Sequence, residues 1–86
     1  MLRARALLAR GEYGPARVLL EGLIARQPEA LLPWVILSDV LLTEGRDWEA
    51  AEQALRDVLE REPQHGETRH NLNVLRRRLG REAVAV

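Results

Sequence analysis

The side chains that could perform catalysis are few in this chain, and their spacing does not suit it. Ser38 is the single serine, and we expect it in the middle of a helix, whereas a nucleophilic serine is usually presented on a sharp turn. His65 and His70 are five residues apart, so they do not share one helical face as the i, i+4 spacing of a metal pair would require. The sequence therefore predicts no catalytic residue, no metal site and no cofactor.

Paired carboxylates are the other candidates for acid–base chemistry. Glu49 and Glu52, and likewise Glu60 and Glu62, fall on the expected exposed side of one helix, where charged residues usually serve solvation. Cysteine is absent, which removes disulfides, thiolate metal ligands and a cysteine nucleophile. We therefore expect a protein that is not an enzyme.

Charge and hydropathy argue against several classes of partner. The 13 basic and 13 acidic residues give a formal net charge of zero, whereas a general polyanion binder needs a basic excess. No run reaches the ~18 apolar residues that would cross a membrane. Arginines interrupt the apolar residues of segment 1–10, unlike the unbroken centre of a signal peptide. We expect no nucleic-acid partner, no membrane insertion and a cytoplasmic location.

Glycine and proline divide the chain into helical segments. Gly11, Gly45 and Gly80 each follow an apolar periodic stretch, as glycines just past a helix end often do. Asp47 suits the N-cap of the fourth segment, and Pro63 stops that segment. The third segment is apolar nearly all round, so it is either buried on two sides or carries a binding surface on one of them. The pattern predicts helices over residues 1–10, 15–26, 32–44, 47–62 and 66–80.

These segments recur along the chain with a period of 34 to 35 residues. Gly11 and Gly45 are 34 residues apart and Gly45 and Gly80 are 35 apart, because the turn after Gly45 holds one extra residue. The residues that match at an offset of 35 are Tyr13 with Trp48, Ala16 with Ala51, Leu20 with Leu55, Arg26 with Arg61, Pro28 with Pro63 and Leu37 with Leu72.

A helix–turn–helix unit of about 34 residues is the signature of the tetratricopeptide repeat, and this chain resembles that family over nearly its whole length. The middle copy follows the family's pattern with Trp34, Leu37, Ala51 and Pro63, while Ser38 replaces the family's glycine with another small residue. The resemblance implies an all-α, right-handed solenoid of helix–turn–helix repeats with about five helices. It places one domain over residues 1–81, with repeats at about 1–30 and 31–65, a terminal helix at about 66–80, and a frayed tail at 82–86.

The third copy departs from the family pattern. Arg69, Asn73 and Arg76 stand where the family has Trp, Gly and Tyr, and a long polar side chain is not expected to pack inward there. The end of a solenoid needs a polar outer face, so we expect this helix to be a solvating cap. A basic patch free of acidic residues is expected on it, formed by Arg69, Arg76, Arg77, Arg78 and Arg81.

The resemblance also implies a site for a partner. In tetratricopeptide proteins the first helix of each repeat lines a concave surface that holds a peptide or a helical segment. Mapped onto this chain, that surface is apolar in the middle and charged at its edges, which suits an apolar or amphipathic segment of a protein partner. The partner-binding residues assigned in this way are Leu32, Val35, Ile36, Asp39, Leu42, His70, Asn71, Val74 and Arg77.

Asp39 is the unusual member of this set because its expected neighbours are apolar. A buried carboxylate without a partner is costly, so Asp39 should be exposed or paired. Arg5 occupies the equivalent place one repeat earlier, and we therefore predict an ion pair between Arg5 and Asp39.

Two other functions stay open on the sequence. Fewer than three full repeats leave an apolar groove that a second copy of the chain could cover, which would make the protein a homodimer. The segment could instead be an accessory part of a larger enzyme, such as a bacterial transferase, where it would position a substrate or a partner without activity of its own.

Overall fold

The computed structural model describes residues 2–80, and that part of the chain forms five α-helices with no β-strand. The all-α fold predicted from the sequence is confirmed, and the helix ends lie within about two residues of their predicted positions. The frayed tail predicted over residues 82–86, like Arg81 of the predicted basic patch, lies outside the described residues. The helices are α1 (Leu2–Ala9), α2 (Tyr13–Arg26), α3 (Leu31–Glu44), α4 (Trp48–Arg61) and α5 (Gly66–Arg78).

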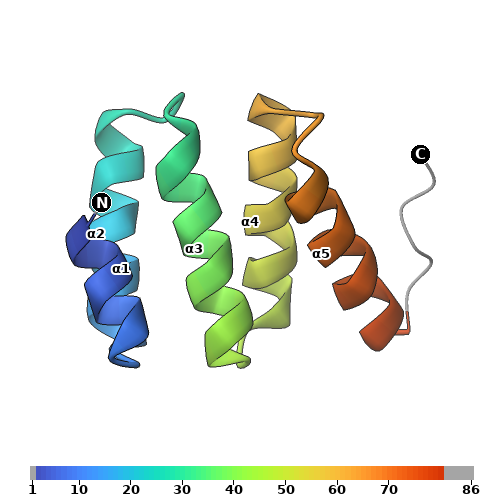
Figure 1. Cartoon of the computed structure of the whole chain (residues 1–86), viewed down its shortest axis with the longest axis horizontal. Helices are drawn as coiled ribbons and strands as arrows, with labels where there is room; N and C mark the ends of the chain where they lie inside the picture. The colour runs from blue at the N-terminus through green and yellow to red at the C-terminus, as the bar shows by residue number, and fades with distance from the viewer. Residues whose placement is uncertain (1, 81–86) are drawn as a thin grey trace.

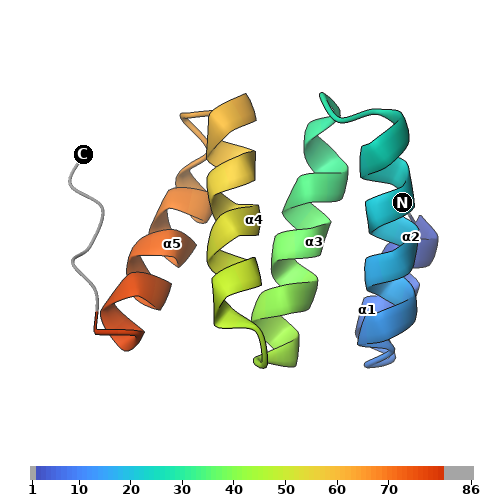
Figure 2. The same ribbon diagram turned by 180° about the vertical axis from the view of Figure 1, so that it is seen from behind.

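Consecutive helices pack beside one another in chain order and run antiparallel to their neighbours (Figures 1 and 2). α3 packs against both α2 and α4, α1 packs against α2 and also contacts α3, and α5 packs against α4. α5 leans away from α4 toward its C-terminal end, as both views show.

α3 lies at the centre because it is apolar on nearly every side. Ile36 and Val40 are fully buried, and Ser38 is buried at a point where a small side chain lets helices approach closely. α3 therefore packs on two sides, against α2 and α4, which is one of the two alternatives that the sequence left open for this helix. The core cluster consists of Ala4, Ala16, Leu20, Ile36, Leu37, Val40, Leu41, Ala51, Ala54, Leu55, Leu72 and Leu75.

The turn between α3 and α4 is fixed by two residues. Gly45 ends α3 with a φ of +67°, a left-handed conformation that a residue with a Cβ adopts only at a cost. Asp47 then caps α4, because its Oδ1 accepts a hydrogen bond from the backbone N–H of Ala50 at 3.0 Å. The predicted N-cap is confirmed, and the tight turn places the first residue of α4 beside the end of α3.

The carbonyl oxygen of Pro28 joins the α2–α3 turn to the end of α4. Trp34 Nε1 donates to this oxygen at 2.9 Å, and Arg61 Nε donates to it at 2.6 Å. The Arg61 guanidinium also lies 4.4 Å from the centre of the Trp34 ring, and its Nη1 donates to the Asp57 carbonyl at 3.0 Å. One arginine thus connects two helices and a loop that are distant in the sequence.

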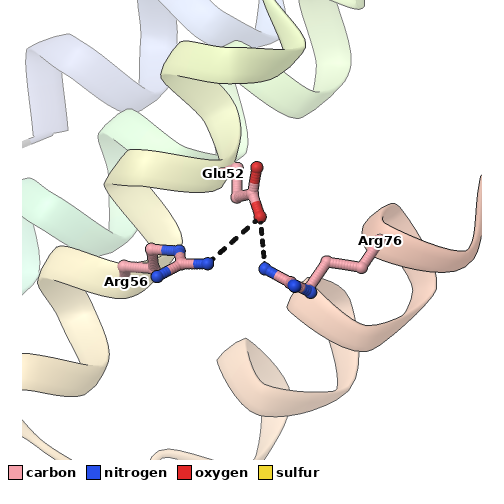
Figure 3. Close-up of polar contacts among 3 residues, drawn as sticks. All are labelled: Glu52, Arg56 and Arg76. Atoms are coloured by element: carbon pink, nitrogen blue, oxygen red, sulfur yellow. Dashed lines mark hydrogen bonds and ion pairs between the residues drawn. The ribbon is translucent and has the colours of Figure 1, made fainter. Parts of the chain in front are cut away.

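The expectations for Glu52 and Arg76 are wrong, because neither side chain is a solvated surface group. Glu52 is buried, and the side chain of Arg76 is only 18% exposed. Arg76 Nη1 donates to Glu52 Oε2 at 2.6 Å, and Arg56 Nη2 reaches the same oxygen at 3.4 Å (Figure 3). The predicted basic patch is therefore not free of acid.

The physical reason is charge pairing across the α4–α5 contact. Arg76, which the sequence placed on a solvated face, packs inward because Glu52 neutralises its charge there. Prediction from helical periodicity treats charged side chains as exposed, so it does not detect two charged side chains that are buried together as a pair.

We expect Arg61→Ala to lower the free energy of unfolding by about 1–2 kcal/mol, because it removes the bond to the Pro28 carbonyl and the contact with Trp34. Chemical denaturation followed by circular dichroism would measure the loss. Arg26→Ala is the matched control, since Arg26 ends α2 as Arg61 ends α4 but is exposed, and it should change stability by no more than about 0.5 kcal/mol. Equal losses in the two variants would contradict this role of Arg61.

Candidate functional site

Ser38 and His65, two of the side chains considered for chemistry, are engaged within the fold. Ser38 Oγ donates to the Val35 carbonyl oxygen at 2.7 Å, and Thr68 Oγ1 lies 2.7 Å from His65 Nδ1 in a hydrogen bond. Among residues 2–80, no three His, Cys, Asp or Glu side chains are grouped closely enough to hold a metal ion. None of the helices described is both long and apolar enough to cross a membrane.

An apolar hollow of about 270 Å³ lies where α3, α4 and α5 meet. Its lining brings together three of the residues predicted to contact a partner, Leu42, Asn71 and Val74. Sequence reasoning missed Trp48 and Leu75, whereas Arg78 was already expected on α5 as part of the basic patch. The full lining consists of Leu42, Trp48, Asn71, Val74, Leu75 and Arg78.

The fold explains why these residues meet. Leu42 is in the last turn of α3, and the tight turn at Gly45 brings Trp48, the first residue of α4, close beside it. α5 runs antiparallel to α4, so its last turns, with Val74 and Arg78, return to the same end of the molecule (Figure 1). α5 leans away from α4 toward this end, which is also the end that carries the lining residues of the hollow (Figure 1).

In the sequence, Trp48 stands out only as the residue that matches Tyr13 in the repeat, which assigns it no role in a site. It packs against the core, but its side chain is only partly buried and forms a wall of the hollow. The short turn from Gly45 to Asp47 is the feature of the sequence that could have predicted this position, because so short a turn places Trp48 beside the end of the preceding helix.

The remaining predicted contact residues are distributed differently. Leu32 is exposed, Val35 is half-buried, and neither lines the hollow. His70 and Arg77 are exposed on α5 but lie outside it as well. Ile36 requires a correction: it is fully buried, because it shares a helical stripe with Val40 that faces the core.

α5 presents one stripe of side chains beside the hollow. Glu67, Asn71, Val74 and Arg78 follow one another at spacings of four, three and four residues, so they fall within about 60° of one another around the helix. Glu67 and Arg78 are exposed, and Val74 keeps 36% of its surface exposed. The stripe therefore begins with a carboxylate, ends with a guanidinium and has its apolar residue between them.

Asp39 lies half-buried on α3, close enough to Glu67 for the two charges to interact. Burial raises the pKa of the Asp39 carboxyl, and the Glu67 charge raises the pKa further. Arg5 and His65 act in the opposite direction on the same pKa. The predicted Arg5–Asp39 ion pair is absent from the described part of the chain, although the Arg5 charge is felt by Asp39.

Other hollows are present on the described surface. One of them, of about 630 Å³, lies between α1 and α2, and its lining includes Leu7, Val18 and Leu19. None of the residues predicted to contact a partner lines it. The hollow at α3, α4 and α5 is therefore the candidate functional site.

Comparison of the chain with protein-family models and with curated proteins gives no match.

We expect Asp39→Asn to raise the melting temperature at neutral pH. The raised pKa means that the ionised Asp39 carboxylate destabilises the folded state, and this penalty disappears as the pH falls through the pKa of the folded state. The difference between variant and wild type should therefore shrink toward zero at about pH 3. Thermal melts at both pH values test this, with exposed Glu60→Gln as a control that should shift the melt little at either pH. If Asp39→Asn were less stable than wild type at neutral pH, the conclusion that the ionised Asp39 carboxylate destabilises the folded state would be wrong.

Proposed function

We propose that this protein is a non-catalytic, cytoplasmic protein-interaction module of the tetratricopeptide type, a right-handed solenoid of helix–turn–helix repeats. Its partner is a peptide or a helical segment, which docks beside the hollow formed by α3, α4 and α5. The bound segment places an apolar side chain between Leu42, Trp48 and Val74.

The recurrence of the helix bounds supports the repeat assignment. α2 and α4 each contain 14 residues and begin at Tyr13 and Trp48, and α3 and α5 begin at Leu31 and Gly66. Both pairs of helix starts are 35 residues apart, which is the offset of the sequence repeat. The left-handed glycine after α3 recurs at Gly80, which follows α5.

The observation that carries the proposal is the hollow itself. Residues assigned to partner contact from the sequence converge with an aromatic wall in one open, apolar depression. Trp48 gives the hollow a large rigid surface, and Asn71 and Arg78 provide hydrogen-bond donors at its edge. This combination of an apolar centre and a polar rim is typical of sites that bind protein segments.

The energetics are those of side-chain burial. Filling the hollow with one aliphatic or aromatic side chain would contribute about 1.5–3 kcal/mol, with the ordering of the bound segment opposing it. Contacts along α3, including exposed Leu32, would extend the bound segment beyond the hollow. We therefore expect the protein to bind such a segment with moderate affinity, most of which comes from a few residues at the centre of the site.

A library of helical peptides displayed on phage and selected against the wild-type protein tests this proposal. Peptides that bind should bind Val74→Asp at least about tenfold more weakly, because a carboxylate would then have to be desolvated in the hollow. Val18→Asp is the matched control, since Val18 is 71% exposed on α2 and does not line this hollow.

The selection is carried out at low protein concentration, so that self-association of the protein does not cover the hollow. Peptides that bind Val74→Asp as well as wild type but lose affinity for Val18→Asp would move the site to the hollow between α1 and α2. That result, or a selection that yields no binder, would contradict the proposal.

A further inference from the structure

The order of side chains along the α5 stripe is complementary to itself. The stripe runs Glu67, Asn71, Val74, Arg78 and is about 16 Å long. When the same helix is laid beside it in the opposite direction, Glu67 comes to face Arg78 and Asn71 comes to face Val74. An acidic residue meets a basic one at both ends, and the apolar residue meets the amide in the middle.

A single two-fold axis satisfies both pairings. The pair Glu67–Arg78 and the pair Asn71–Val74 are each centred between Leu72 and Asn73 along the helix. An isologous interface requires this common centre, because every contact in it must occur twice about one axis. A stripe with its charges in another order would have placed like charges opposite one another.

We propose that a second copy of this chain occupies the surface, with the two α5 helices packed antiparallel along this stripe. The inference rests on the proposed function, in which a helical segment docks at this surface, and it identifies that segment as α5 of a second copy.

The surroundings of the stripe favour such a partner. Val74 of the second copy lies over Asn71, at the edge of the hollow whose apolar walls are Leu42, Trp48 and Leu75. The formal net charge of zero means that long-range repulsion does not keep two copies apart. The apolar area is small, so the pair should be weak and reversible, with the charges setting its register more than its affinity.

The ends of the stripe are also short of counter-charge within one copy. Glu67 lies near a second carboxylate, that of Asp39, whose pKa it raises, while Arg5 and His65 compensate only in part. Arg78 of the second copy would meet both carboxylates. At the other end, the exposed Arg78 would receive Glu67 of the second copy.

Charge reversals distinguish this pairing from nonspecific association. Sedimentation equilibrium over about a hundredfold range of concentration should show wild type passing from monomer to dimer. Glu67→Arg alone and Arg78→Glu alone should each weaken the dimer at least about tenfold, because each homodimer then places like charges opposite one another twice. An equimolar mixture of the two variants should recover wild-type affinity, since every pair in the heterodimer is again of opposite sign.

Arg77→Glu is the matched control, because it makes the same charge change one residue outside the stripe. It should dimerise about as wild type does, and it should not recover dimerisation when mixed with Glu67→Arg. Thermal melts of each variant monitor folding. A wild type that stays monomeric, a mixture that fails to recover, or an equal effect of Arg77→Glu would overturn the pairing. The peptide selection at low concentration would still decide the proposed function separately.

Engineered cysteines give a second readout, which is clean because the chain has no native cysteine. An Asn71→Cys copy mixed with a Val74→Cys copy should form the mixed disulfide in preference to either symmetric one, because only residues 71 and 74 of opposite copies face each other closely. A mixture of Val18→Cys with Val74→Cys should show no such preference. Equal amounts of all disulfides in both mixtures would contradict the proposed register.

Discussion

The ion pair between Glu52 and Arg76 is the contact on which the far end of this fold depends. It crosses from α4 to α5, its Nη1–Oε2 distance is 2.6 Å, and both side chains are mostly withdrawn from solvent. A buried pair of this kind adds little over an apolar contact of the same shape, but losing one partner leaves the other charge buried and costs several kcal/mol. The pair therefore fixes which way α5 faces more than it adds to stability.

The orientation of α5 determines which of its side chains line the hollow and form the stripe proposed to contact a partner. With Leu72 and Leu75 in the core and Arg76 directed at α4, the stripe through Asn71 and Val74 is turned toward the hollow. A rotation of α5 by one residue position, about 100°, would carry that stripe away from α3 and dismantle the site. Arg76, which fixes the orientation of α5, and Val74, which lies on the proposed partner surface, are therefore in the same helical turn.

The sequence predicts much of the fold and only part of the site. Glycines after the helices, the Asp47 cap and the apolar periodicity each act locally, so five helices and their ends could be read directly. The burial of Glu52 and the exposure of one side of Trp48 depend instead on how α5 leans, which no local pattern encodes. Ile36 was misplaced for the related reason that its helix is apolar on nearly all sides, so periodicity could not distinguish the core stripe from the surface stripe.

Backbone amide hydrogen exchange of wild type and Glu52→Gln tests most directly whether this ion pair holds α5 in place. We expect the α5 amides of the variant to exchange about thirtyfold faster, equivalent to a loss of about 2 kcal/mol, while amides of α2 and the first turns of α3 keep their protection. Glu60→Gln, a change of the same kind at an exposed position of α4, should leave the pattern unaltered. Wild-type exchange of α5 in Glu52→Gln, or a uniform loss of protection over all helices, would contradict the claim.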